Sequence, residues 1–85
     1  GALAEGLPQV DTETADLSAV DAFKLAGLAS SNGEARRLIR GGGARLNDAV
    51  ISDEDARLTA DDFDADGKAK LSAGKKRHVI LKKTG

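Results

Sequence analysis

Three consecutive glycines, Gly41-Gly42-Gly43, divide the sequence into two parts that differ in how their apolar residues repeat. Before the glycines, apolar residues recur at intervals of three and four, which is the period of an α-helix. After them, apolar and polar residues alternate, as they do in a β-strand. A chain of 85 residues has no room for a second core. We therefore expect one α+β domain, with two short packed helices against a small antiparallel sheet of about four strands.

Two serines mark the expected starts of the helices. Ser18 is followed three residues later by Asp21, and Ser31 by Glu34, a spacing that lets side chains cap the backbone N–H groups of a first turn. Gly27 suits the position just beyond the end of a helix, as do the three glycines. We expect a first helix of about two turns and a second that stops at the glycines.

The second expected helix has an apolar face and a basic one. At 100° per residue, Ala35, Leu38 and Ile39 form a stripe that would pack on the core. The opposite face carries three arginines and a glycine, namely Arg36, Arg37, Arg40 and Gly33. Arginine makes planar, bidentate pairs with phosphate oxygens, and a glycine would let a phosphodiester come close to the helix backbone.

The residues beyond the glycines predict two hairpins separated by one helical turn. Asn47-Asp48 is a polar hairpin turn, Gly74 is a second break, and Thr59-x-x-Asp62 is a short cap for a single helical turn. The strands are expected at residues 44–46, 50–51, 68–73 and 76–82.

Residues 1–17 are acidic and lack a sustained apolar period, so we expect a flexible linker there and a domain at 18–83. The chain opens without Met, which indicates a piece of a longer protein.

The net charge of −1 conceals four blocks of charge. Residues 24–45 hold five bases and one acid, and residues 67–85 hold seven bases and no acid. Residues 1–23 and 46–66 are acidic. Folding could gather the basic blocks on one face that binds a polyanion, whereas the alternative is Lys and Arg scattered over an ordinary soluble surface. The candidate contacts are Arg36, Arg37, Arg40, Arg45, Lys75, Lys76 and Arg77, with Gly33 as the place of close approach.

The composition excludes several kinds of site. Without Cys there is no disulfide and no thiolate metal site, and two Phe with no Trp or Tyr cannot form an aromatic stacking platform. His78 has no Cys, Asp or Glu between residues 67 and 85, so neither a metal site nor a catalytic dyad can form locally. We expect no catalytic residue and no cofactor, and an RNA ligand read through its backbone and shape.

An acidic loop offers an alternative from another class. Asp62-x-Asp64-x-Asp66-Gly67 matches positions 1, 3, 5 and 6 of a calcium-binding EF-hand loop. Position 12 should be a bidentate Glu and is Ala73 instead. We favour a solvated acidic turn, with calcium binding as the alternative.

Two separate blocks of sequence resemble a known family. The first block is similar to the αL RNA-binding motif and consists of residues 26–31 and 33–39, the three glycines and Leu46-Asn47. That motif occurs in a small-subunit ribosomal protein, in pseudouridine synthases and in bacterial tyrosyl-tRNA synthetases. The ending at residues 71–81 narrows the resemblance to the C-terminal domain of the bacterial synthetases. The likeness covers roughly residues 17–82. It departs at Asn32, where that family often has Lys.

The resemblance implies a tRNA-binding domain attached to a catalytic body outside this chain. It implies that the arginines of the second helix and residues 75–77 contact tyrosine tRNA, chiefly at the variable arm and the anticodon stem. ATP and Mg²⁺ would then belong to the catalytic body, in a cytoplasmic, homodimeric parent enzyme with no membrane partner. This domain alone would be a monomer without enzymatic activity. The alternative within the same motif is a module that binds ribosomal RNA.

Overall fold

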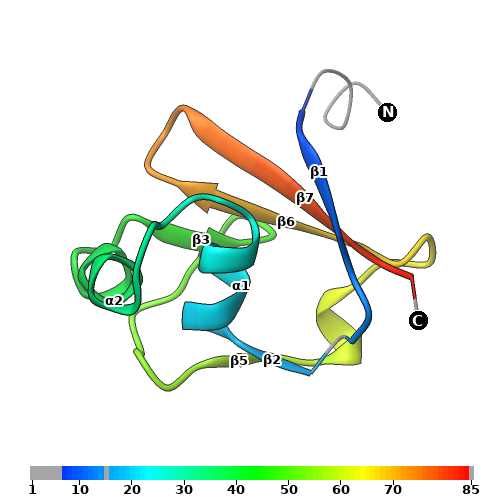
Figure 1. Ribbon diagram of the computed structural model, residues 1–85, viewed down its shortest axis with the longest axis horizontal. Coiled ribbons are helices and arrows are strands. Elements are labelled where there is room, and N and C mark those ends of the chain that lie inside the picture. The colour runs from blue at the N-terminus through cyan, green and yellow to red at the C-terminus, as the bar shows by residue number, and fades with distance from the viewer. Residues whose placement is uncertain (1–6, 15, 85) are drawn as a thin grey trace.

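The structure of the chain, a computed structural model, describes residues 7–14 and 16–84. Two helices cover one face of a five-stranded sheet, and a two-stranded sheet lies below them in Figure 1. This arrangement confirms the predicted α+β class. The elements in chain order are β1 (Gln9–Thr12), β2 (Leu17–Ser18), α1 (Ala19–Leu25), α2 (Asn32–Arg40), β3 (Ala44–Leu46), β4 (Ala49–Val50), β5 (Arg57–Leu58), the 3₁₀ turn η1 (Ala60–Asp62), β6 (Lys68–Ala73) and β7 (Arg77–Lys83).

Both helices begin at the predicted caps. Ser18 Oγ accepts a hydrogen bond from the N–H of Asp21 at 3.1 Å, and Ser31 Oγ accepts one from the N–H of Glu34 at 3.1 Å. The second half of the Ser31–Glu34 cap differs from the expected pattern, because the Glu34 carboxylate accepts from the N–H and Oγ of Ser30. The caps therefore fix the connection between the helices as well as the start of α2.

The sheet has the order β1-β7-β6-β3-β4. The hairpin of β6 and β7 pairs Ala73 with Arg77 across the turn at Gly74. Asn47 and Asp48 both have positive φ, of 51° and 72°, as a two-residue type I′ turn requires between β3 and β4. The four strands expected from the sequence are thus present, as antiparallel pairs.

The prediction of a flexible linker over residues 1–17 is wrong at two places within the described residues. Strand β1 pairs in parallel with β7, from Gln9 opposite Ile80 to Thr12 opposite Lys83, and adds a fifth strand to the sheet. Strand β2 pairs with β5 through Leu17 and Leu58. Strands of four and two residues are too short to show a period, and both partners are distant in sequence, so no local signal identified them. Residues 1–6 and residue 15 lie outside the described residues.

The core lies between the helices and the sheet. Its largest side chains, Phe23, Ile39, Leu58, Leu71 and Leu81, are at most 1% exposed. Burying each such side chain stabilises the fold by about 1.5–3 kcal/mol. Because Ile39 comes from α2 and Phe23 from α1, this core fixes both helices against the sheet. None of the helices in the described residues has the length and apolar character needed to cross a membrane.

Candidate nucleic-acid interface

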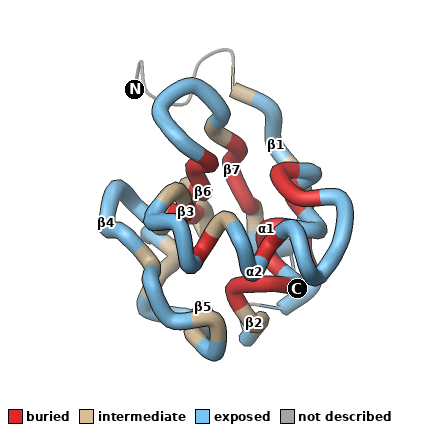
Figure 2. The backbone as a smooth tube through the Cα atoms, turned by 90° about the vertical axis from the view of Figure 1, so that its left-hand side faces the viewer, coloured by how far each residue is buried: buried red, intermediate tan, exposed pale blue. Residues whose placement is uncertain are grey.

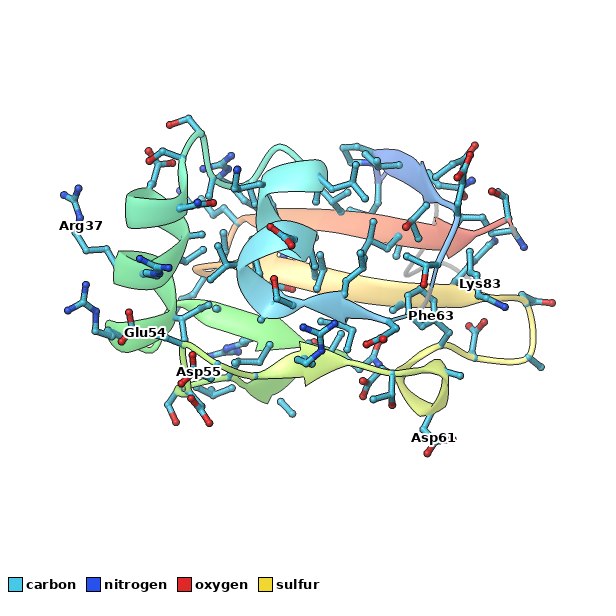
Figure 3. All side chains as sticks on the ribbon, turned by 60° about the horizontal axis from the view of Figure 1, so that its bottom comes forward. Arg37, Glu54, Asp55, Asp61, Phe63 and Lys83 are labelled. Atoms are coloured by element: carbon cyan, nitrogen blue, oxygen red, sulfur yellow. The ribbon has the colours of Figure 1, made fainter. Side chains whose placement is uncertain are left out.

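Helix α2 presents the predicted basic face to solvent. Ala35 and Ile39 are fully buried, and the other apolar residue of the stripe, Leu38, is partly buried against the core. The arginines and the glycine of the opposite face, Gly33, Arg36, Arg37 and Arg40, are all exposed. Figure 3 shows Arg37 directed away from the body of the domain. The burial of one face therefore determines which way the three guanidinium groups point.

The turn between β6 and β7 lies against the end of α2. The N–H of Gly74 donates to the carbonyl oxygen of Gly43 at 2.8 Å, and the N–H of Gly43 donates to that of Leu38 at 3.0 Å. A Cβ atom at Gly43 would lie 2.9 Å from Leu38 Cδ1, so any larger residue here would require the Leu38 side chain to shift. Lys75 and Lys76 are exposed on the turn, which Figure 2 shows above α2 on one end of the domain. The glycines thus bring two basic segments together that are more than 30 residues apart in sequence.

Arg77 ties the β6–β7 turn to the connection between the helices. Its Nη2 donates to the carbonyl oxygen of Gly27 at 3.0 Å. Two hydrogen bonds from Ser30 lower the pKa of the Glu34 carboxyl, and the charges of Arg77 and Arg37 lower it further. The Arg77 guanidinium is therefore close to the first turn of α2.

His78 holds the same turn from the other side. Its Nδ1 lies 2.8 Å from Ser72 Oγ, and its Nε2 lies 3.1 Å from the carbonyl oxygen of Lys75. A carbonyl oxygen can only accept, so Nε2 carries a hydrogen and donates it. The sequence indicated that His78 could form neither a metal site nor a catalytic dyad locally, and favoured a structural or RNA-contacting role without naming its partners. Its structural role depends on the pairing of Ser72 with His78 across two strands, which no local pattern reveals.

Acidic residues mark one edge of the basic face. Arg40 Nε lies 3.4 Å from Glu54 Oε1, in the loop between β4 and β5. Figure 3 places Glu54 and Arg37 at the same end of the domain. Arg36 and Arg37 have no ion-pair partner among residues 7–14 and 16–84. No local pattern in the sequence indicates that Glu54 reaches α2.

The comparisons with known proteins agree with this geometry. The family model described as "Tyrosine--tRNA ligase SYY-like C-terminal domain" matches residues 1–81. The chain belongs to this family. A tyrosine–tRNA ligase of Methylocella silvestris is 52% identical to this C-terminal domain over 96% of the chain and 20% of the relative's length. A tyrosine–tRNA ligase of Bradyrhizobium diazoefficiens is 48% identical over 96% of the chain and 21% of the relative.

A solved structure supports the same assignment. The solution structure of a tyrosyl-tRNA synthetase C-terminal domain matches with a TM-score of 0.74 and 26% sequence identity, over 92% of this chain and 79% of that one. The C-terminal domain described here spans about a fifth of the length of the curated relatives that it matches.

The remaining predicted basic residues of the C-terminal domain are not all on the α2 side. Arg45 is half-buried, and it alternates along β3 with Ala44 and Leu46, which pack toward the helices. Its side chain therefore lies on the opposite face of the sheet. Of the seven bases in residues 67–85, only Lys75, Lys76 and Arg77 lie near α2, while Lys83 is at the far end in Figure 3. The hypothesis that the two basic blocks share one face thus holds only for part of each block.

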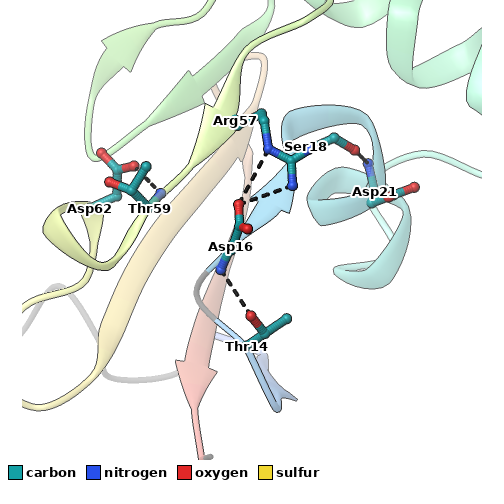
Figure 4. Close-up of polar contacts among 7 residues, drawn as sticks. All are labelled: Thr14, Asp16, Ser18, Asp21, Arg57, Thr59 and Asp62. Atoms are coloured by element: carbon teal, nitrogen blue, oxygen red, sulfur yellow. Dashed lines mark hydrogen bonds and ion pairs between the residues drawn. The ribbon is translucent and has the colours of Figure 1, made fainter.

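Two carboxylates of the acidic turn, those of Asp62 and Asp64, accept hydrogen bonds from backbone N–H groups. Asp62 accepts from the N–H of Thr59 at 2.8 Å (Figure 4), and Asp64 Oδ1 accepts from Asp66 and Lys68 at 2.9 Å each. These backbone hydrogen bonds lower the pKa of Asp64, and the one from Lys68 has the largest effect on it. No three His, Cys, Asp or Glu side chains of residues 7–14 and 16–84 are grouped as a metal site requires. The calcium alternative is therefore not supported by the geometry.

Proposed function

We propose that this chain is the tRNA-binding domain of a tyrosine–tRNA ligase, and that α2 and the β6–β7 turn together hold the phosphate backbone of the tRNA. The observation that supports the proposal is the hydrogen bond between Gly43 and Gly74, because it holds the turn that carries Lys75 and Lys76 against the end of α2, whose arginines are exposed. This arrangement concentrates positive charge at one end of a chain whose net charge is −1.

Exposed arginines are well suited to this task. A guanidinium group donates two parallel hydrogen bonds to a phosphate, and its exposure means that little desolvation opposes binding. Each neutralised phosphate releases condensed counterions, so affinity should depend strongly on salt. Gly33, which has nothing within 4 Å of where its Cβ would be, leaves the first turn of α2 open to a phosphodiester.

The finer assignment is also a proposal. The names of the relatives and the basic face support tyrosine tRNA as the ligand. That the tRNA is held at its variable arm and anticodon stem is what the resemblance to the family implies. Amino-acid activation would then take place in the remaining four-fifths of a homodimeric, cytoplasmic parent enzyme. ATP and Mg²⁺ would bind there, as the resemblance to the synthetase family implies. The domain, a monomer on its own, would contribute affinity and orientation.

The test is a titration of fluorescently labelled tyrosine tRNA with this chain at several salt concentrations. The logarithm of the affinity should fall with the logarithm of salt by about 0.7–0.9 per phosphate contact. Arg37→Ala should weaken binding and reduce that slope by about one contact. Arg57→Ala is the matched control, since Arg57 lies on β5 and pairs with Asp16 at 3.0 Å (Figure 4).

Two results would contradict the proposal. Equal losses of tRNA affinity in Arg37→Ala and Arg57→Ala would show that the affinity depends on the total charge of the domain and not on the α2 face. Stronger binding to a ribosomal RNA fragment than to tyrosine tRNA would favour the ribosomal alternative.

A further inference from the structure

A cleft of about 340 Å³ opens where the β6–β7 turn, the α1–α2 connection and the residue before β1 meet. Apolar residues line it, namely Pro8, Ala26, Leu28 and Val79, together with the basic residues Lys76 and Arg77. Its volume is at the lower end of the range of small-molecule sites, about 300–1,000 Å³. The cleft therefore has the size and the mixed lining of a site for a small, flat group.

Arg77 is held in a fixed orientation at this cleft. The hydrogen bond from its Nη2 to the carbonyl oxygen of Gly27 fixes a side chain that would otherwise rotate freely at the surface. Gly27 itself lines the cleft and has a φ of +76° that favours glycine. The guanidinium is therefore a pre-arranged planar group beside apolar walls.

We infer that this cleft receives one unstacked nucleobase of the bound RNA, with Arg77 as its stacking surface. The inference rests on the proposed function and adds a base contact to an RNA interface that otherwise consists of phosphate contacts. Unpaired bases of RNA stack on aromatic rings or on guanidinium planes. Phe23 is fully buried and Phe63 is partly buried in the core. His78 also lines the cleft, but its ring is held by Ser72 Oγ and the carbonyl oxygen of Lys75. Arg77 therefore takes the place of an aromatic ring.

The neighbouring charges favour a nucleotide over a purely apolar occupant. Lys76 lines the cleft and can pair with the phosphate of the same nucleotide. The α1–α2 connection that forms one wall leads directly into α2, whose arginines hold the phosphates of adjoining nucleotides. In Figure 1 this connection runs alongside the β6–β7 turn, so a strand crossing both would pass the cleft.

The test compares adenosine 5′-monophosphate with ribose 5-phosphate, which has the same sugar and phosphate but no base. Each is titrated into the ¹⁵N-labelled chain, and binding is followed by amide NMR shifts. Because stacking of one base strengthens binding by about 5- to 150-fold, the nucleotide should bind at least about fivefold more tightly. The largest shifts should occur at Gly27, Leu28, Arg77 and Val79. Equal affinities, or shifts located elsewhere, would overturn the inference.

Two variants separate stacking from charge. Arg77→Lys keeps the charge and removes the plane, so the preference for the nucleotide should disappear. Ala26→Leu should fill the cleft and give the same result, and its amide spectrum shows whether it folds. Arg57→Ala is the control, in which the preference should persist, since Arg57 lies on β5 and does not line the cleft.

The same chain distinguishes this inference from the proposed function. If tyrosine tRNA binds with a steep salt dependence while the two small ligands bind equally, only the base cleft is wrong. If tRNA does not bind, the proposed function itself fails.

Discussion

At the scale of single residues, Glu54 limits the basic face of α2. Its carboxylate lies 3.4 Å from Arg40 Nε, where a phosphate oxygen would otherwise bind, and both side chains are exposed, by 38% and 62%. An exposed pair of this kind contributes only about 0.2–1 kcal/mol to stability. Glu54 is thus better placed to compete with a ligand than to hold the fold together.

We predict that Glu54→Gln strengthens tRNA binding by about two- to fivefold, because Arg40 no longer has to leave a carboxylate to reach a phosphate. The free energy of unfolding should hardly change. Asp61→Asn makes the same charge change away from Arg37 (Figure 3) and should have a smaller effect on binding. Equal gains in both variants would mean that only net charge changes the affinity.

Glu34 makes the stability of the domain depend on pH. Its pKa lies below the ordinary value of 4.5 because it accepts two hydrogen bonds from Ser30. A carboxylate whose pKa is lowered by folding stabilises the native state above its unfolded pKa, and this stabilisation is lost as pH falls through the lowered value.

We predict that Glu34→Gln is less stable than the original chain near pH 7 and that this difference shrinks as pH falls from about 6 to about 3. Urea unfolding at several pH values measures it. If the difference in the free energy of unfolding stays constant with pH, the charge of Glu34 does not contribute to the stability of the domain.

At the scale of elements, the glycines around α2 serve two different purposes. Gly42 has a φ of +77°, a conformation that lets the chain leave the helix. Gly33 lies within α2, where a Cβ would meet nothing within 4 Å. Gly42 is required by the backbone, whereas Gly33 is tolerated at a cost in helix stability and leaves room beside the arginines.

We predict that Gly33→Ala raises the free energy of unfolding by about 0.5–1 kcal/mol and weakens tRNA binding, because the added methyl group lies on the basic face. Gly42→Ala should instead lower the free energy of unfolding by about 1–2 kcal/mol, since alanine is strained at positive φ. Chemical denaturation and the tRNA titration measure the two effects. Unchanged tRNA affinity in Gly33→Ala would show that the backbone at residue 33 is not approached by the ligand.

The elements that the sequence predicted are those with local signals. The caps at Ser18 and Ser31, the stripe on α2 and the turn at Asn47-Asp48 depend on residues a few positions apart. Strand β1 could not be predicted, because its parallel pairing with β7 joins residues about 70 apart. Arg45 shows the same limit, since the face on which it lies depends on where the helices pack.

At the scale of the whole molecule, the charges are partly separated, although Glu54 lies at the α2 end and Lys83 at the opposite end (Figure 3). The α2 face and the β6–β7 turn form one basic end, while η1 and the acidic turn around Asp64 lie away from it in Figure 1. Charge separation of this kind orients an approaching polyanion before contact. The domain should therefore meet a tRNA with its α2 end foremost.

The most direct test is an amide NMR shift map of the ¹⁵N-labelled chain on addition of tyrosine tRNA. The largest changes are predicted in residues 27–43 and 74–78, with little change in residues 57–67. Changes centred on residues 57–67, or none at saturating tRNA, would contradict the proposal that α2 and the β6–β7 turn hold the tRNA.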